Sequence, residues 1–199
     1  MIMLEMLTES PLTPSSTLGP YRAADYMSLP DEPRCELIYG RLFVSPSPVP
    51  VHQVIVLQLG VAMDTLAAET GGVAFVAPMD VTLFEHSVVQ PDVVYVSPGR
   101  RGILHDRIEG APDLVVEVLS PSTTRRDRGD KMRLYASSGV SEYWVVDPMA
   151  RQVEFLVNED GRFVVELPQD SVYTSRTIPG LELDIAALWK TVDSRLGLA

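Results

Sequence analysis

The chain has 199 residues, a net charge of −11 at neutral pH and a sequence pI of about 4.6. Apolar residues make up 46% of it and charged residues 22%, which is typical of a globular protein with a sizeable core. The acidic charge argues against a general nucleic-acid coat protein, and the single cysteine, Cys35, excludes an internal disulfide and predicts a small buried side chain.

The N-terminal residues carry no pattern of secretion. The first ten, MIMLEMLTES, lack the basic stretch and the clean apolar stretch of a signal peptide. No segment of the chain approaches about 18 uninterrupted apolar residues, the length of a membrane span. We therefore expect a cytoplasmic protein with no membrane partner. Residues 1–19, rich in Ser, Thr and Pro, predict a loose arm, and residues 20–199 then form a single domain.

The first half of the predicted domain combines short extended segments with one long helix. Residues 20–29 predict a short helix, and residues 35–50 a hairpin whose strands meet at Tyr39-Gly40. Apolar side chains recur every three or four residues over 52–69, which predicts a helix ended by Gly71-Gly72. Further predicted elements are strands at 73–84 and 89–98 and a loop at 100–111.

A strand–helix–strand unit follows. Residues 113–119 predict a strand, residues 120–126 a turn, and residues 127–139 a helix with Asp127 as its N-cap and Gly139 as its end. Residues 142–148 predict a second strand, parallel to the first and reached by a right-handed crossover.

The C-terminal part completes a mixed α/β fold in which helices cover a central sheet. Residues 151–167 predict a hairpin that turns at Asp160-Gly161, and residues 181–189 predict a closing, terminal helix. Tyr143 and Trp144 are adjacent on the preceding strand, so we expect one aromatic side chain to pack on each face of the sheet.

Glu117 stands out within its predicted strand. The apolar residues around it are typical of a strand buried on both faces, where an unpaired carboxylate costs several kcal/mol. Asp92 starts a different strand, and because neighbouring strands lie roughly 4.8 Å apart, Asp92 can face Glu117. Asp113 lies roughly 13 Å along the same strand, and we expect it to cap the preceding loop instead.

Two carboxylates held this closely repel each other unless a divalent cation lies between them or one is protonated. Mg²⁺ takes one or two carboxylates, water and a phosphate oxygen, so Asp92 and Glu117 predict a metal site. The alternative is a neutral Glu117, or one paired with an arginine. Lys131 lies four residues into the following helix, at about the same distance from the connecting turn as Glu117. Its ammonium can therefore reach this site, or else pair with Asp127 on a solvated face. Tyr135, one turn further on, points the same way.

Six segments, in consistent order over about residues 20–190, together resemble the Uma-two family: ELIYG, SPSPVPVHQ, QPDVVYVSP, APDLVVEVLSPST, RDRGDKMRLYASSGVSEYWVVDP and IPGLELDI. These bacterial proteins are described as restriction endonucleases of the PD-(D/E)XK nuclease superfamily. The resemblance implies a restriction-endonuclease-like α/β fold, with a central mixed β-sheet flanked by α-helices. It also implies an endonuclease that hydrolyses phosphodiester bonds with Mg²⁺, or with Mn²⁺ in its place.

The resemblance assigns metal-ligand roles to Asp92 and Glu117. The superfamily's lysine normally follows the acid by two residues, where this chain has Leu119, and the family position matches Lys131, which we expect to stabilise the transition state. Glu36, in ELIYG, resembles an additional catalytic acid from an N-terminal element, although a strand-edge carboxylate is the alternative. His52 matches the family's HQ and is a candidate substrate contact, or else a polar group at a helix start.

DNA is the expected substrate, and cutting both strands needs two sites, which favours a homodimer. Eight of the sixteen basic residues lie between Arg100 and Arg133 together with six acids, so one face can be positive, unless these charges form an ordinary solvated surface. Candidates to meet the DNA backbone are Arg100, Arg101, Arg125, Arg126 and Arg128. Two other functions stay open: a non-catalytic binding or regulatory module of the same fold, and a metal-dependent hydrolase of RNA or nucleotides.

Overall fold

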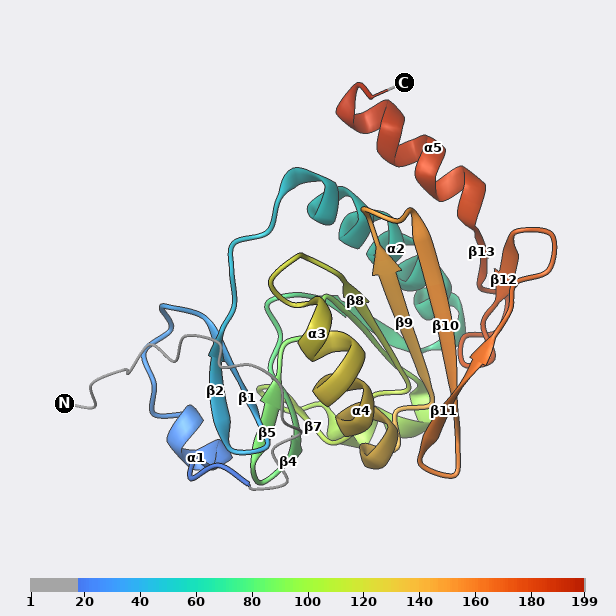
Figure 1. Cartoon of the computed structure of the whole chain (residues 1–199). Helices are drawn as coiled ribbons and strands as arrows, with labels where there is room; N and C mark the ends of the chain where they lie inside the picture. Colours follow the sequence, from blue (N-terminus) through green and yellow to red (C-terminus); the bar gives the residue numbers. More distant parts are fainter. Residues whose placement is uncertain (1–17, 199) are drawn as a thin grey trace.

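The central layer of the protein is a six-stranded mixed sheet, described in a computed structural model that covers residues 18–198 (Figure 1). The predicted loose arm at residues 1–19 therefore lies almost entirely outside the described residues. The strand order is β11-β10-β9-β8-β6-β3, and only β8 and β9 of this sheet run parallel. The strands are β3 (Val73–Val76), β6 (Val93–Val96), β8 (Leu114–Val118), β9 (Glu142–Asp147), β10 (Gln152–Glu159) and β11 (Arg162–Glu166).

A second, five-stranded sheet lies beside the first and has the order β2-β1-β5-β4-β7 (Figure 1). The predicted N-terminal hairpin is confirmed, because β1 and β2 pair antiparallel from Cys35–Val44 to Ile38–Arg41 and turn at Tyr39-Gly40. Cys35 is buried, as expected. The strands are β1 (Cys35–Ile38), β2 (Arg41–Val44), β4 (Val81–Phe84), β5 (Ser87–Val89) and β7 (Ile108–Glu109).

The prediction of one strand over 73–84 was wrong. This stretch forms β3 in the six-stranded sheet and β4 in the five-stranded sheet, and residues 77–80 connect the two. Pro78 lies in the connection, and because proline cannot donate a ladder hydrogen bond, it separates the strands. The short strand β5 was not predicted, and the predicted loop 100–111 contains β7 and part of a 3₁₀ helix at Pro98–Ile103.

Two helical segments cover opposite faces of the six-stranded sheet (Figure 1). Helix α2 (Pro50–Thr70) buries Ile55, Leu59 and Met63 on one face, in the core that also contains Trp144. Helix α4 (Met132–Ser138) buries Leu134 and Tyr135 on the other face, in the core that contains Tyr143. The expected placement of Tyr143 and Trp144 on opposite faces is therefore confirmed.

Helix α2 is long and apolar enough to pass for a membrane span by length and composition, the one such helix among residues 18–198. Its side chains Ile55, Leu59 and Met63 are almost fully buried against the sheet, which is the behaviour of a core helix. The helix begins two residues before the predicted start and ends at Gly71, in the left-handed conformation expected for a C-terminal glycine.

The segment after β9 forms a hairpin, a small two-stranded sheet and the last helix. The hairpin β10–β11 turns at Asp160-Gly161 as predicted. The closing segment 181–189 was predicted as helix but first forms β13 (Glu182–Asp184), which pairs with β12 (Val172–Thr174). Helix α5 (Ile185–Leu196) then starts with Asp184 as its N-cap, whose carboxylate accepts a hydrogen bond from the backbone N–H of Ala187 at 2.9 Å. A short N-terminal helix, α1 (Ala23–Tyr26), lies within the predicted 20–29 segment.

The end of α2 is a tight contact that can be tested. A Cβ at Gly72 would lie 2.5 Å from the Tyr95 hydroxyl oxygen, whereas a Cβ at Gly102 would meet nothing within 4 Å. We predict that Gly72→Ala lowers the free energy of unfolding by about 1–3 kcal/mol through overpacking. Gly102→Ala is the matched control and should change it by less than about 0.5 kcal/mol. Urea unfolding measures both, and equal values for the two variants would contradict the packing described here.

Candidate active site

Asp92 and Glu117 face each other across adjacent strands, as the sequence predicted. The β6–β8 pairing aligns Val93 with Val116, and this register continued by one residue places Asp92 opposite Glu117. Val94 and Val115 belong to the core on the α4 side, so the alternation of side chains directs Asp92 and Glu117 to the same face. Asp113 takes its expected separate role, because its carboxylate accepts a hydrogen bond from Ser97 N at 2.7 Å in the loop after β6.

Glu117 is buried but paired, and this explains how its strand tolerates a charge. Its residue is 4% exposed, and its Oε1 accepts hydrogen bonds from Lys131 Nζ at 2.7 Å and from the Tyr135 hydroxyl at 2.6 Å. Lys131 and Tyr135 therefore both reach Glu117, as the sequence predicted. The partner of Glu117 is this lysine, not the arginine of the alternative interpretation.

Lys131 joins three acids in what we call the acid–lysine cluster: Glu36, Glu117, Asp127 and Lys131. Its Nζ lies 2.8 Å from Glu36 Oε1 and 3.6 Å from Asp127 Oδ1, in addition to its bond with Glu117. Glu36, on β1, also accepts a hydrogen bond from Gln90 N at 2.8 Å. The pair with Asp127 that the sequence offered as an alternative exists, but it is buried, not solvated.

The helix that carries Lys131 begins earlier than predicted. Thr124 donates hydrogen bonds to Ser120 O through its backbone N–H at 3.0 Å and its hydroxyl at 2.7 Å, which starts α3 (Thr124–Arg126) directly after the turn. A π-helical turn (Asp127–Lys131) then leads into α4, which ends at Gly139 as predicted. The assignment of Asp127 as N-cap was therefore wrong, because this residue lies inside the helix and points toward Lys131. Turns of π-helix are rare in proteins, and those that occur are often found at functional sites.

Burial and mutual charge set the protonation of the cluster. Burial raises the pKa of Glu117 well above its ordinary value, Lys131 opposes this rise, and the charges of Asp127, Asp92 and Glu36 add to it. Burial also raises the pKa of Asp127, against the effect of Lys131. For Lys131, burial disfavours the charge, but Glu117, Glu36 and Asp127 outweigh it and raise its pKa. One ammonium thus lies among three carboxyl groups, two of which, Glu117 and Asp127, have raised pKa values.

Asp92 lies nearer the surface than the cluster, with a side chain 15% exposed. Its Oδ2 accepts a hydrogen bond from Val118 N at 2.7 Å and lies 3.2 Å from His52 Nε2. His52 is near the start of α2, and its Nδ1 is buried without a hydrogen-bond partner. The structure thus brings His52 to Asp92, while its predicted contact with substrate stays a prediction.

The oxygens left over on these acids fit a divalent cation held by two carboxylates. Within residues 18–198, Glu117 Oε2 and Asp92 Oδ1 accept no hydrogen bond, and both face the shared side of the β6–β8 pair. The described part of the chain contains no preformed group of three or more His, Cys, Asp or Glu side chains arranged to hold a metal. Two carboxylates completed by water and a substrate phosphate oxygen are nevertheless the usual environment of Mg²⁺.

The predicted DNA-binding arginines differ in their surroundings. Arg126 lies beside the cluster, with its Nε 3.8 Å from Glu36 Oε2 and its guanidinium carbon 5.1 Å from the Phe43 ring centre. Arg125 is exposed, and Arg128 pairs with Glu154 and Asp147. Arg100 and Arg101 hold structure, because Arg100 donates to three backbone carbonyls and pairs with Asp113, while Arg101 donates to Gly72 O.

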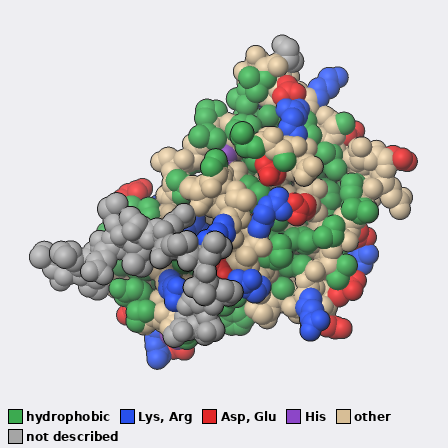
Figure 2. Space-filling view, in the orientation of Figure 1, with side chains coloured by type: hydrophobic (Ala, Val, Ile, Leu, Met, Phe, Trp, Pro, Cys, Tyr) green, Lys and Arg blue, Asp and Glu red, His purple; other side chains and the backbone are tan. Residues whose placement is uncertain are grey.

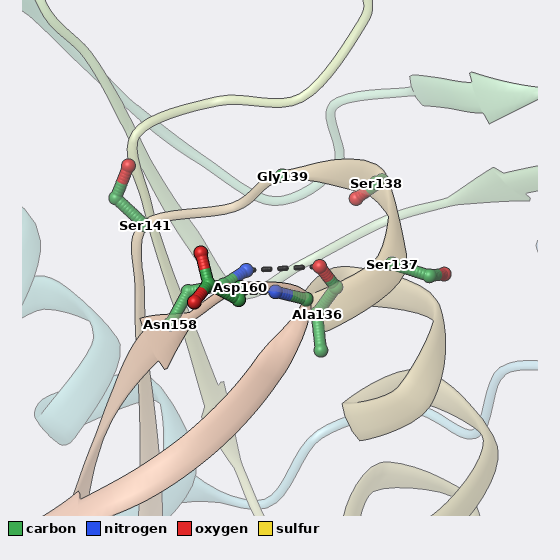
Figure 3. A pocket seen from close by; sticks show the side chains of 8 residues that line it. Ala136, Ser137, Ser138, Gly139, Ser141, Asn158 and Asp160 are labelled. Atoms are coloured by element: carbon green, nitrogen blue, oxygen red, sulfur yellow. Dashed lines mark hydrogen bonds between the residues drawn. The ribbon is translucent and has the colours of Figure 1, made fainter.

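Two surface hollows lie away from these acids. One, of about 390 Å³, is at the C-terminal end of α4 and is lined by residues that include Ser137, Ser138, Ser141 and Asp160 (Figure 3). There the Asn158 amide donates to Ala136 O at 2.9 Å and is fully used in holding the turn. Another, of about 160 Å³, lies between β11 and β12. The face shown in Figure 2 carries basic and acidic side chains side by side, several of them near its centre.

Comparison with known proteins identifies the family. The family model described as "Uma2: Putative restriction endonuclease" matches residues 23–186. The chain belongs to the Uma2 family. The Uma-two resemblance seen in the sequence is thereby confirmed, and the match extends over nearly the whole described domain.

Two further relatives of this Uma2 chain were found. A solved structure described as "a putative nuclease belonging to DUF820 from Anabaena variabilis" superposes with a TM-score of 0.73 at 21% identity, over 87% of this chain and 99% of that one. It shows that the restriction-endonuclease-like α/β fold predicted from the sequence is correct. "Uncharacterized protein slr1290" of Synechocystis is 43% identical over 56 residues, which span 27% of this chain and only 30% of that protein.

The cluster makes a strong prediction about stability. Lys131→Met leaves three buried carboxyl groups without their cation, and breaking a buried pair in this way should lower the free energy of unfolding by about 3–5 kcal/mol. Lys190, the other lysine of the chain, is exposed on α5, and Lys190→Met is the matched control. It should change the free energy of unfolding by less than about 0.5 kcal/mol. Denaturant unfolding compares the two, and a Lys131 variant as stable as the control would show that the ion pairs are not formed.

Proposed function

We propose that this protein is a Mg²⁺-dependent endonuclease that hydrolyses DNA phosphodiester bonds, with Mn²⁺ able to replace Mg²⁺. The observation that carries the proposal is the pairing of Asp92 with Glu117 in register across β6 and β8, each acid retaining one oxygen without a hydrogen bond. Membership of a family described as restriction endonucleases supports it.

Each side chain has a distinct task in this proposal. Asp92 and Glu117 would hold the ion, which when bound lowers the pKa of its water and polarises the phosphoryl oxygen. Val118 N and His52 fix Oδ2 of Asp92, and Lys131 and Tyr135 fix Oε1 of Glu117, so that the remaining oxygens are aimed before substrate arrives. Glu36 holds Lys131 in place from the neighbouring sheet.

The substrate would lie across the surface. The acids do not line either of the two hollows described above, and a DNA backbone, being a wide polyanion, needs an open face with phosphate contacts. Cutting both strands of a duplex requires two such sites, which is why we include a homodimer in the proposal. The proposal also includes a cytoplasmic location.

One observation favours a second candidate function, a non-catalytic module that keeps the nuclease fold. Lys131 already neutralises Glu117 and Glu36 at 2.7 and 2.8 Å, so the acids have a structural use without any metal ion. Metal binding separates the two functions, because a purely structural cluster has no need of a divalent cation.

A plasmid cleavage assay tests the catalytic function. Asp92→Asn and Glu117→Gln keep the shape of the side chains but remove the charge that binds Mg²⁺. The rate of cleavage should therefore fall by roughly 100-fold or more. Asp64→Asn, at an exposed position on α2, is the matched control and should cleave like the wild type. Nuclease activity that is the same in the wild type, both site variants and a mock preparation would reject the assignment.

Calorimetry with Mn²⁺ supplies a readout that does not depend on cleavage. The wild type should bind the ion, and Asp92→Asn should weaken that binding by roughly ten- to hundredfold. No binding by a folded wild-type protein would favour the non-catalytic module. A panel of RNA, single-stranded DNA and nucleotides in the same assay distinguishes DNA from the other substrates considered.

A further inference from the structure

Lys131 is held by buried acids and is poorly accessible to a substrate. Its Nζ donates a hydrogen bond to Glu117 Oε1 at 2.7 Å and pairs with Glu36 Oε1 at 2.8 Å, while Asp127 Oδ1 lies 3.6 Å away, beyond hydrogen-bond distance. Its side chain is 3% exposed. To touch a phosphate, it would have to leave these acids buried and unpaired, which is costly.

Arg126 is in the opposite situation. Its Nε is buried without a hydrogen-bond partner, and its separation of 3.8 Å from Glu36 Oε2 is too long for a hydrogen bond. No group within residues 18–198 accepts a hydrogen bond from the other nitrogens of this guanidinium either. An arginine carries five N–H donors, and a buried donor without a partner is costly, so this group is prepared for an acceptor that binds from outside.

The guanidinium of Arg126 is nevertheless held in place. It lies over the Phe43 ring of β2 at 5.1 Å, and the Glu36 carboxylate lies beside it. Such stacking fixes the plane of the guanidinium and leaves its edge for bidentate contact with an anion. Its neighbours do not share this position, because Arg125 is exposed and Arg128 is already paired with Glu154 and Asp147.

We propose that Arg126 contacts a phosphate of the bound nucleic-acid backbone next to the acids, and that Lys131 is a positioning residue that holds Glu36 and Glu117 without touching the substrate. This inference rests on the proposed function. It assigns the direct phosphate contact to one arginine of the predicted set and takes it away from the lysine.

The experiment measures binding of a labelled DNA duplex by fluorescence anisotropy over a range of salt concentrations, without divalent cations. Arg126→Met should weaken binding by roughly ten- to hundredfold and reduce the salt slope by about one phosphate contact. Arg126→Lys keeps the charge but not the bidentate geometry, so it should restore the slope and only part of the affinity. Mn²⁺ binding and thermal stability should stay close to those of the wild type in both variants.

The chain offers a matched control in Arg151, which also stacks on an aromatic ring, Trp189, at 5.1 Å and pairs with a carboxylate, Asp193. Arg151→Met should leave DNA binding unchanged. Lys131→Arg, which keeps the positive charge where Lys131→Met fails to fold, should weaken Mn²⁺ binding and leave the salt slope as it is.

The outcomes separate this inference from the proposed function. DNA binding and salt slope that are unchanged in Arg126→Met, or a slope reduced in Lys131→Arg, would overturn the assignment while cleavage by the wild type still supported the endonuclease. A wild type that does not cleave DNA, but binds it through Arg126, would overturn the endonuclease and keep the contact. A wild type that neither binds nor cleaves DNA would overturn both.

Discussion

The site is organised by one buried ammonium group shared between two β-sheets. Lys131 contacts Glu36 of the five-stranded sheet and Glu117 of the six-stranded sheet through a single Nζ. A buried lysine without acids, or these acids without the lysine, would each carry the full cost of an unpaired charge. The interaction therefore ties the N-terminal hairpin to the central strand.

The same arrangement explains why a nuclease-family site exists in so acidic a chain. The chain carries a net charge of −11, and three of its acids are concentrated around one lysine, with Asp92 opposite Glu117. Carboxylates repel a nucleic-acid backbone but attract a divalent cation, so in the proposed function the acids hold the ion and other groups contact the phosphates. Arginines at the edge of the cluster then have to offset the repulsion, and most of the basic residues nearby are already committed to carbonyls or carboxylates.

Much of this site was predictable from strand order and spacing. A charged residue in an apolar strand, a Pro-Asp pair before the neighbouring strand and a lysine at matching height were enough to place Asp92, Glu117 and Lys131 together. The pair of Asp127 with Lys131 was predicted as an alternative from their spacing of four residues, but its burial was not, and Asp127 was also taken as the N-cap. Its polar side chain before an apolar helix looks the same as an N-cap, and only tertiary packing distinguishes the two.

The fold was predicted where local patterns suffice and missed where the sheets divide. The β1–β2 hairpin, helix α2 and the parallel pair β8–β9 follow from turn residues and periodicity. The division of residues 73–84 between two sheets does not, because a β-branched run on either side of a proline has no local mark of which sheet it joins. Likewise, the five segments that supply Glu36, His52, Asp92, Glu117 and Lys131 are united only by long-range contacts.

The π-helical turn at Asp127–Lys131 makes the positions of Lys131 and Tyr135 depend on the number of residues in this helix. A π turn accommodates one residue more than an α turn, and each residue of an ordinary helix rotates the chain by about 100°. Losing a single residue here would wind the turn back to α geometry and swing either the lysine or the tyrosine away from Glu117. The number of residues in this helix, as well as their identity, therefore determines whether Lys131 and Tyr135 both reach Glu117.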